Sequence, residues 1–193
     1  FVYRLDDQDR LVHFGTGADF DATAGGVAIT PLLGRSLWSC IGEGTTQDLY
    51  RQLIKRARAG RRMRVHYRCD DAAHRRWFEM VIVAVPGGEV ECTSHLLKEE
   101  LRPSVALLEP GQERTADLVR MCSWCQRFAV SEDRWLPVEE AADALHLLER
   151  QHVPRITHGI CPDCFRRVNA EAERWVDGPL LPGAWIEQDA FTV

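Results

Sequence analysis

The chain has 193 residues, of which 45% are hydrophobic and 27% are charged, as in an ordinary globular protein. This composition excludes disorder over most of the chain, and no run approaches the roughly 18 apolar residues of a membrane helix, so we expect no membrane span. The net charge of -5 comes from residues 101–193, which have 10 basic and 15 acidic side chains. Residues 1–100 have 14 of each, and this difference in charge favours two modules.

The first hundred residues follow the pattern of an α+β domain. Residues 1–5 and 11–14 are short apolar runs on either side of a polar turn, and they predict an opening β-hairpin. Apolar side chains at helical spacing predict a helix over residues 45–59, which Gly60 can end.

Three further strands are predicted at residues 63–69, 76–85 and 89–97. In the first of them apolar and mainly basic side chains alternate, which is typical of a strand with one buried and one solvated face. The order of two strands, a mainly helical stretch and three strands predicts a five-stranded antiparallel sheet with helices.

This arrangement resembles a PAS domain. Residues 1–7 look like the opening strand of that family, and the segment Leu33 to Trp38 (LGRSLW) looks like its turn into the helix. The resemblance covers about half the chain and implies a sensory or dimerisation domain over residues 1–100. The predicted helix has no histidine, and Cys40 does not lie in the cysteine motif of flavin photosensors, so neither haem nor flavin is supported.

The interior between the predicted helix and sheet has six candidate residues for a ligand pocket. They are Trp38, Leu53, Tyr67, Phe78, Met80 and Ile82. The same side chains can instead fill a packed core, which is the default expectation.

Residues 101–114 contain Pro103, Pro110 and Gly111 among charged residues, and they predict a linker. The second module then spans residues 115–193. Helical spacing within it predicts helices over residues 138–150 and 163–175, so we expect a small helical module.

Two Cys-x-x-Cys pairs in this second module are the strongest chemical motif of the sequence. Cys122 and Cys125 form the first pair, and Cys161 and Cys164 follow after 35 residues. Each pair can place two thiolates in one tight turn, and two such turns complete the tetrahedral site that structural zinc requires. Residues 121–127, 135–139 and 157–164 also resemble the cysteine-rich tail that follows PAS domains in some bacterial signalling proteins.

Other interpretations of the cysteines remain. The pairs could form a dithiol redox switch, hold an iron–sulfur cluster or stay unligated. A thioredoxin-like role favours a βαβ context, which this region does not show. His158 lies three residues before Cys161, and we do not expect it to be a ligand because four thiolates are present.

A basic stretch from residue 51 to residue 68 has no acidic residue. Its members are Arg51, Lys55, Arg56, Arg58, Arg61, Arg62, Arg64 and Arg68. It could bind nucleic acid or an acidic partner, but in a net-negative chain it more simply forms the solvated face of a helix and strand. We also expect the acidic second module, including Glu139, to dock on this stretch.

The sequence as a whole predicts a non-catalytic bacterial signalling protein with a PAS-like domain and a structural zinc module. The alternatives are a thiol-based redox switch or oxidoreductase and a nucleic-acid-binding regulator. An odd number of cysteines at low density favours a reducing compartment, so we expect a cytoplasmic location. Val81, Val83 and Val85 predict a second apolar face, covered in a homodimer, by a signalling partner or by the C-terminal tail.

Overall fold

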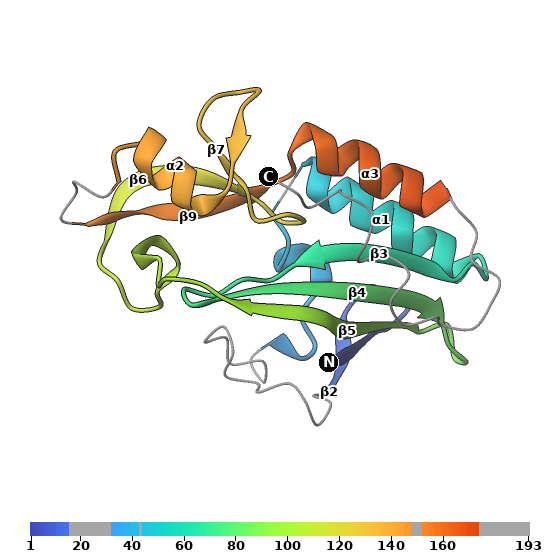
Figure 1. Ribbon diagram of the computed structural model, residues 1–193. Coiled ribbons are helices and arrows are strands. Elements are labelled where there is room, and N and C mark those ends of the chain that lie inside the picture. The colour runs from blue at the N-terminus through green and yellow to red at the C-terminus, as the bar shows by residue number, and fades with distance from the viewer. Residues whose placement is uncertain (16–31, 43, 148–151, 174–193) are drawn as a thin grey trace.

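The computed structural model describes residues 1–15, 32–42, 44–147 and 152–173. In these ranges the chain forms two β-sheets and three α-helices (Figure 1). The predicted α+β class is confirmed. Within the described ranges, no helix is long and apolar enough to cross a membrane.

The first sheet has five antiparallel strands in the order β2-β1-β5-β4-β3. These strands are β1 (Val2–Leu5), β2 (Leu11–Gly15), β3 (Met63–Arg68), β4 (His74–Ala84) and β5 (Val90–Leu101). The five-stranded antiparallel sheet expected from the sequence is therefore confirmed. Among the described residues, β4 is the one strand that pairs with β3, so β3 lies at an edge of the sheet.

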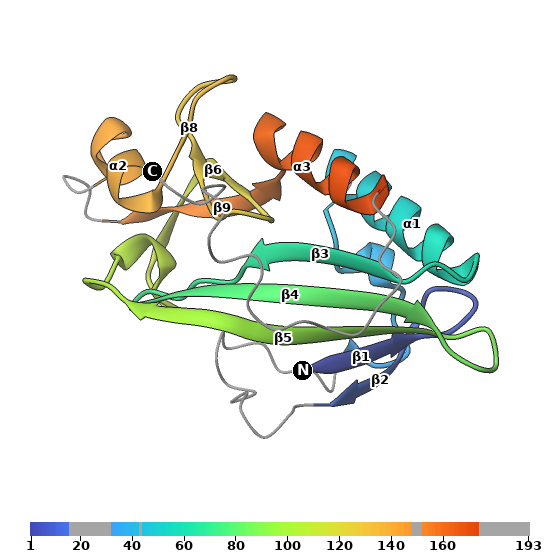
Figure 2. The same ribbon diagram turned by 45° about the vertical axis from the view of Figure 1, so that its right-hand side comes forward.

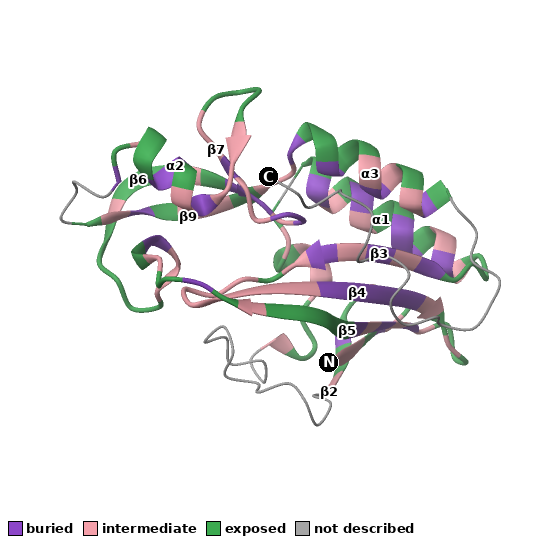
Figure 3. Ribbon diagram, in the orientation of Figure 1, coloured by how far each residue is buried: buried purple, intermediate pink, exposed green. Residues whose placement is uncertain are grey.

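Helix α1 (Thr45–Arg58) covers one face of this sheet (Figures 1 and 2). Its buried residues recur at intervals of three and four, so they form a single apolar face. They are Thr46, Leu49, Leu53, Ile54 and Ala57. In β3 the buried side chains of Met63, Val65 and Tyr67 alternate with half-buried ones and face the same core (Figure 3).

The opposite face of the first sheet is partly covered within the chain itself. Val81 is buried, and Val83 and Val85 are half-buried, so these residues are less exposed than the sequence pattern suggested. Farther along β5, Leu96 and Leu101 are exposed.

The second unit contains a four-stranded sheet in the order β8-β7-β6-β9, in which β6 and β9 are parallel. Its strands are β6 (Arg114–Cys122), β7 (Phe128–Ala129), β8 (Trp135–Leu136) and β9 (Val153–Gly159). The expectation of a small helical module was therefore wrong about its strands. Strands β7 and β8 have only two residues each, and β6 is mostly exposed. None of these three strands therefore shows the alternation of apolar and polar residues that predicts a strand from sequence.

Two helices complete this unit. Helix α2 (Val138–Ala144) starts where predicted but ends early, because His146 has a positive φ of 53° and Leu147 N–H bonds back to the carbonyl of Ala142. Helix α3 (Pro162–Glu173) begins within one residue of its predicted start. The predicted helix ends at residues 150 and 175 lie outside the described residues.

The segment between the two units, residues 101–114, is packed against the rest of the chain. Arg102 is buried, and its side chain donates hydrogen bonds to the carbonyl oxygens of Ala72 and Asp71. A short 3-10 helix, Ala106–Leu108, buries Leu107 in the core of the second unit. This segment therefore contacts both units.

We predict that Leu53→Ala destabilises the protein by about 2 to 5 kcal/mol, because Leu53 is fully buried between α1 and the first sheet and its loss leaves a cavity. Urea unfolding measures the change in the free energy of unfolding. Leu101→Ala is the matched control, since this leucine is 80% exposed and should change stability by less than about 0.5 kcal/mol. Equal effects of the two substitutions would contradict the described core.

Candidate metal centre

The four paired cysteines converge on one buried point. Cys122 is the last residue of β6 and Cys125 lies in the turn that follows, whereas Cys161 precedes α3 and Cys164 lies in its first turn. All four are buried, and their sulfur atoms lie within 4.8 Å of one another. The group expected from the sequence is therefore assembled.

The parallel pairing of β6 and β9 brings the two pairs together. Cys122 lies opposite Gly159 in this ladder, so the two strands end at the same place. The first pair begins at the last residue of β6 and the second begins two residues after β9, and Ser123 N–H donates to the carbonyl of Gly159 between them. The first turn closes tightly because Gln126 has a positive φ of 62° and its N–H bonds to the carbonyl of Cys122.

The sulfur arrangement fits a tetrahedral metal ion such as zinc. With zinc–sulfur bonds of about 2.3 Å, the edge of a regular tetrahedron is about 3.8 Å. The sulfur atoms of Cys125 and Cys161 are 3.7 Å apart. Four thiolates also match the donor set of a closed structural zinc site.

Hydrogen bonds from N–H groups surround the sulfur atoms. Cys161 N–H donates to the sulfur of Cys122, and Cys164 N–H donates to the sulfur of Cys161, each at 3.4 Å. The guanidinium of Arg167 lies 3.8 Å from the sulfur of Cys164. Such donors stabilise thiolates and orient metal ligands. The second pair also lies at the positive N-terminal end of α3.

Because the four sulfur atoms interact, the pKa values of the cysteine thiols shift in opposite directions. Hydrogen bonds from the other three cysteines lower the pKa of Cys122, whereas interaction with Cys122 raises the pKa of Cys125 and of Cys164. The raised pKa values of Cys125 and Cys164 therefore oppose ionisation of all four thiols without a cation. A divalent metal supplies the positive charge that lets all four ionise.

Trp124 connects this centre to the first sheet. It lies between the two cysteines of the first pair and is only 1% exposed, with its ring stacked 5.3 Å from that of Tyr50 on α1. Its carbonyl oxygen accepts a 2.8 Å hydrogen bond from the N–H of Arg68 on β3. The turn that supplies two metal ligands is thus inserted into the core beside α1.

Helix α3 continues this contact along the free edge of β3, beside α1 (Figure 2). The N–H of His66 points to the carboxylate of Glu171 at 3.3 Å, and the carbonyl of His66 accepts from Arg167 at 3.1 Å. Arg56 of α1 also donates to the carbonyl of Ala172 at 2.6 Å. Backbone groups that a neighbouring strand would otherwise satisfy are therefore bonded by α3.

A buried charge network lies at this contact. The ring of His66 is 3.4 Å from a carboxylate oxygen of Glu79 and 3.5 Å from one of Glu171. Arg64 also contacts Glu79, and Arg167 contacts Glu171. Burial lowers the pKa of His66, but the two carboxylates outweigh burial and raise it to about 9.

The second module packs on the basic stretch as expected, but through α3 and not through Glu139. Glu139 of α2 pairs with Arg75 of β4 at 2.7 Å and lies 3.5 Å from the buried Arg102. Neither arginine belongs to the basic stretch. The contact with that stretch is instead made by α3, through Glu171 and the carbonyl of Ala172.

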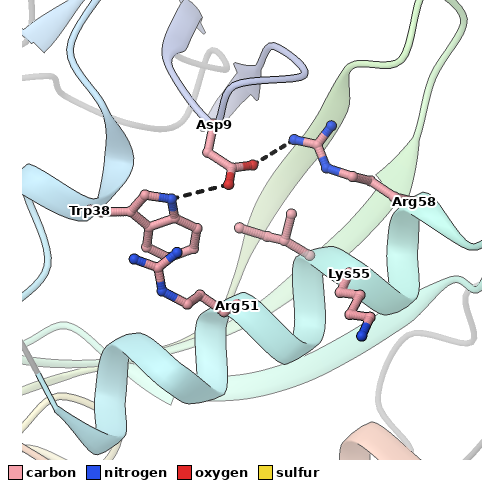
Figure 4. A pocket seen from close by; sticks show the side chains of 6 residues that line it. Asp9, Trp38, Arg51, Lys55 and Arg58 are labelled. Atoms are coloured by element: carbon pink, nitrogen blue, oxygen red, sulfur yellow. Dashed lines mark hydrogen bonds and ion pairs between the residues drawn. The ribbon is translucent and has the colours of Figure 1, made fainter.

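The six candidate pocket residues occupy two places. Leu53, Tyr67, Phe78, Met80 and Ile82 lie together in the buried core between α1 and the first sheet. Within it the Tyr67 hydroxyl donates to Ser94 at 2.9 Å, and its ring stacks on that of Phe78. Trp38 is partly buried against the edge of this core and lines a surface pocket that Figure 4 shows.

Some cations of the basic stretch pair with acidic residues and others do not. Arg58, Arg64 and Arg68 each pair with an acidic residue. Among the described residues, Lys55, Arg61 and Arg62 have no acidic partner. His158, the alternative ligand considered above, is not among the clustered metal-ligating atoms of the described chain.

Sequence reasoning missed three residues that hold the centre in place. In the sequence, Trp124 is one of the two residues between the first pair of cysteines, and Arg167 and Glu171 lie within the predicted helix over residues 163–175. One signal was present, because a tryptophan between two ligands in a tight turn rarely stays exposed. The arginine and glutamate are four residues apart on α3, and only the three-dimensional contact with β3 distinguishes them from an ordinary surface pair.

Comparison with known proteins finds no matching family model, no matching curated sequence and no matching solved structure. The assignment of the centre therefore depends on its geometry.

We predict that Cys125→Ser abolishes stoichiometric metal binding and unfolds the second unit, since structural zinc contributes on the order of 10 kcal/mol in small modules. Metal content after denaturation and hydrogen exchange of residues 114–173 measure the two effects. Cys40→Ser is the control, because Cys40 is exposed and lies outside the cluster. A Cys125→Ser protein with full metal content and unchanged exchange would rule out this centre.

We predict that His66 makes stability depend on pH. A pKa raised to about 9 means that His66 stabilises the folded chain fully below about pH 6.5 and loses this contribution as pH rises through 9. The expected loss is about 1 to 3 kcal/mol, and His66→Gln should remove the pH dependence over this range.

Urea unfolding of the metal-saturated protein between pH 6.5 and 9.5 measures this effect. His13→Gln, at an exposed site on β2, is the control and should keep the wild-type profile. Because all variants retain the same four cysteines, differences between profiles isolate the replaced histidine. Identical profiles for the two variants would contradict the role of His66.

Proposed function

We propose that this chain is a non-catalytic sensory protein of signal transduction, in which a structural zinc centre holds a PAS-like domain in one arrangement. The observation that carries this proposal is the position of the cysteine centre. Its first turn inserts Trp124 beside α1, and its helix α3 lies along the edge of β3. A metal centre placed there acts on the first domain directly.

The first domain supports the sensory part of the proposal. Its five antiparallel strands have α1 between the second and the third strand along the chain. The PAS resemblance depends on this order. The resemblance includes the segment from Leu33 to Trp38, whose last two residues begin the short 3-10 helix Leu37–Ser39 before α1. Sensor domains of this kind act by changing contacts with a partner or a second copy, so we propose a homodimer or a signalling partner.

The form of the centre favours a structural role for its metal. Catalytic zinc keeps an open coordination position for water or substrate, whereas four cysteine ligands close the site. All four cysteines are buried, and Trp124 and α3 pack around them. We propose zinc as the metal of this centre. Because thiolates persist in a reducing compartment, we also propose a cytoplasmic location. We propose no nucleic acid as a partner.

A thiol-based redox switch is the second candidate function. The sulfur atoms of Cys125 and Cys161, which come from different pairs, are 3.7 Å apart. Oxidation to a disulfide between these two thiols would need only a short approach, would release two electrons to an oxidant and two protons, and would displace a bound metal. This candidate predicts a reversible disulfide that links the two pairs.

Metal removal followed by hydrogen exchange tests the proposed function. We expect one zinc per chain, and its removal by a chelator in mild denaturant should speed exchange of the Arg68 amide, because that amide is bonded to the metal-binding turn. Trp124→Ala should speed the same exchange while it keeps the metal. Phe165→Ala on the exposed side of α3 is the control and should leave exchange unchanged.

Two outcomes would overturn the proposal. Exchange in β3 that does not change when the metal is removed would show that the centre does not hold the first domain. A purified chain without metal but with a reversible disulfide between Cys125 and Cys161 would favour the redox switch.

A further inference from the structure

We propose that a pocket between α1 and the turn that joins β1 to β2 binds a phosphate dianion, either free or as a monoester group. The pocket has a volume of about 220 Å³ and lies on the basic stretch (Figure 4). Its lining residues are Asp9, Trp38, Arg51, Ile54, Lys55 and Arg58.

One side of the pocket is held rigidly by Asp9. Its carboxylate accepts a hydrogen bond from the indole N–H of Trp38 at 3.0 Å and one from Arg58 at 2.5 Å. The turn itself is fixed by Asp6, whose carboxylate accepts from the N–H groups of Gln8 and Arg10. Both carboxylate oxygens of Asp9 thus accept a hydrogen bond, and its negative charge is paired with Arg58.

Arg58 and Arg51 are positioned in advance. Arg58 donates further hydrogen bonds to the carbonyl oxygens of Asp6 and Gly88, at 2.7 and 2.9 Å. Arg51 lies over the ring of Trp38, with its guanidinium carbon 4.0 Å from the ring centre, and bonds to Gln47 at 3.2 Å. No acidic residue of the described chain pairs with Arg51, so its charge is available to a ligand.

Lys55 lies between them along α1 and also lines the pocket, with its ammonium drawn away from Asp9 and Trp38 in Figure 4. It lies four residues after Arg51 and three before Arg58, so the three side chains share one side of α1. Lys55 is exposed and has no acidic partner in the described ranges. The exposed Arg61 and Arg62 follow the end of the helix and extend the positive potential that attracts an anion.

Charge and size favour a phosphate group. The lining has three cations and one carboxylate, which leaves a net charge of +2, and a phosphate monoester carries about -1.5 to -2 at pH 7. Guanidinium groups bind phosphate oxygens in pairs, while a lysine supplies a mobile point charge. Pockets for whole small-molecule ligands usually measure about 300 to 1,000 Å³, so this smaller pocket suits one anionic group rather than a nucleotide.

Titration of the metal-loaded full chain with inorganic phosphate tests the proposal. At constant ionic strength maintained with chloride, we expect saturable shifts of the Trp38 indole and of α1 amides in NMR spectra. Lys55→Gln should weaken phosphate binding about tenfold, as expected for the loss of one charge-assisted hydrogen bond. Arg62→Gln is the control, since it removes the same charge outside the pocket and should change affinity by less than about twofold.

A parallel titration with O-phosphoserine distinguishes the source of the phosphate. Tighter binding of the monoester supports a phosphorylated partner, and tighter binding of inorganic phosphate supports a free ligand. Shifts that chloride reproduces, or equal losses in Lys55→Gln and Arg62→Gln, would overturn the proposal. A single-stranded oligonucleotide that binds better than phosphate and is weakened equally by both substitutions would also overturn it, in favour of an extended nucleic-acid surface.

Discussion

The free edge of β3 is the constraint on which the arrangement of this chain depends. An edge strand presents unpaired N–H and carbonyl groups, which are costly when buried and attract other strands when exposed. Here the Trp124 carbonyl, the Glu171 carboxylate and the Arg167 guanidinium bond to these groups in place of a sixth strand. The cysteine centre lies at the start of α3 and in the neighbouring turn, so it positions all three partners.

The charged side chains at this edge are only 10 to 20% exposed and come from both units. His66 of β3 lies between Glu79 of its own sheet and Glu171 of α3. A buried ion pair often contributes little net stability, but removal of one partner leaves an unpaired charge and costs several kcal/mol. The network therefore favours one relative position of the two units over others more strongly than it adds to total stability.

The sequence predicted those parts of the fold that depend on local periodicity. Helix α1 and strand β3 were predicted because their apolar residues recur at regular intervals, and the cysteine cluster because its four cysteines occur as two spaced pairs. Strands β7 and β8 were not predicted, since a strand of two residues has no period. Trp124 and Glu171 were missed because their role lies in contacts with residues far away in the chain.

The parallel pairing of β6 with β9 has a consequence for biosynthesis. The ribosome completes the five strands of the first sheet before residue 161 is made, so the first domain emerges before the second cysteine pair exists. Until that pair and α3 are made, the backbone groups of His66 on β3 lack the partners that Glu171 and Arg167 supply. A shortage of metal thus leaves newly made chains with an open strand edge, and such edges join to one another. With zinc bound at the cysteine cluster as proposed, the solubility of the newly made chain would follow the supply of metal.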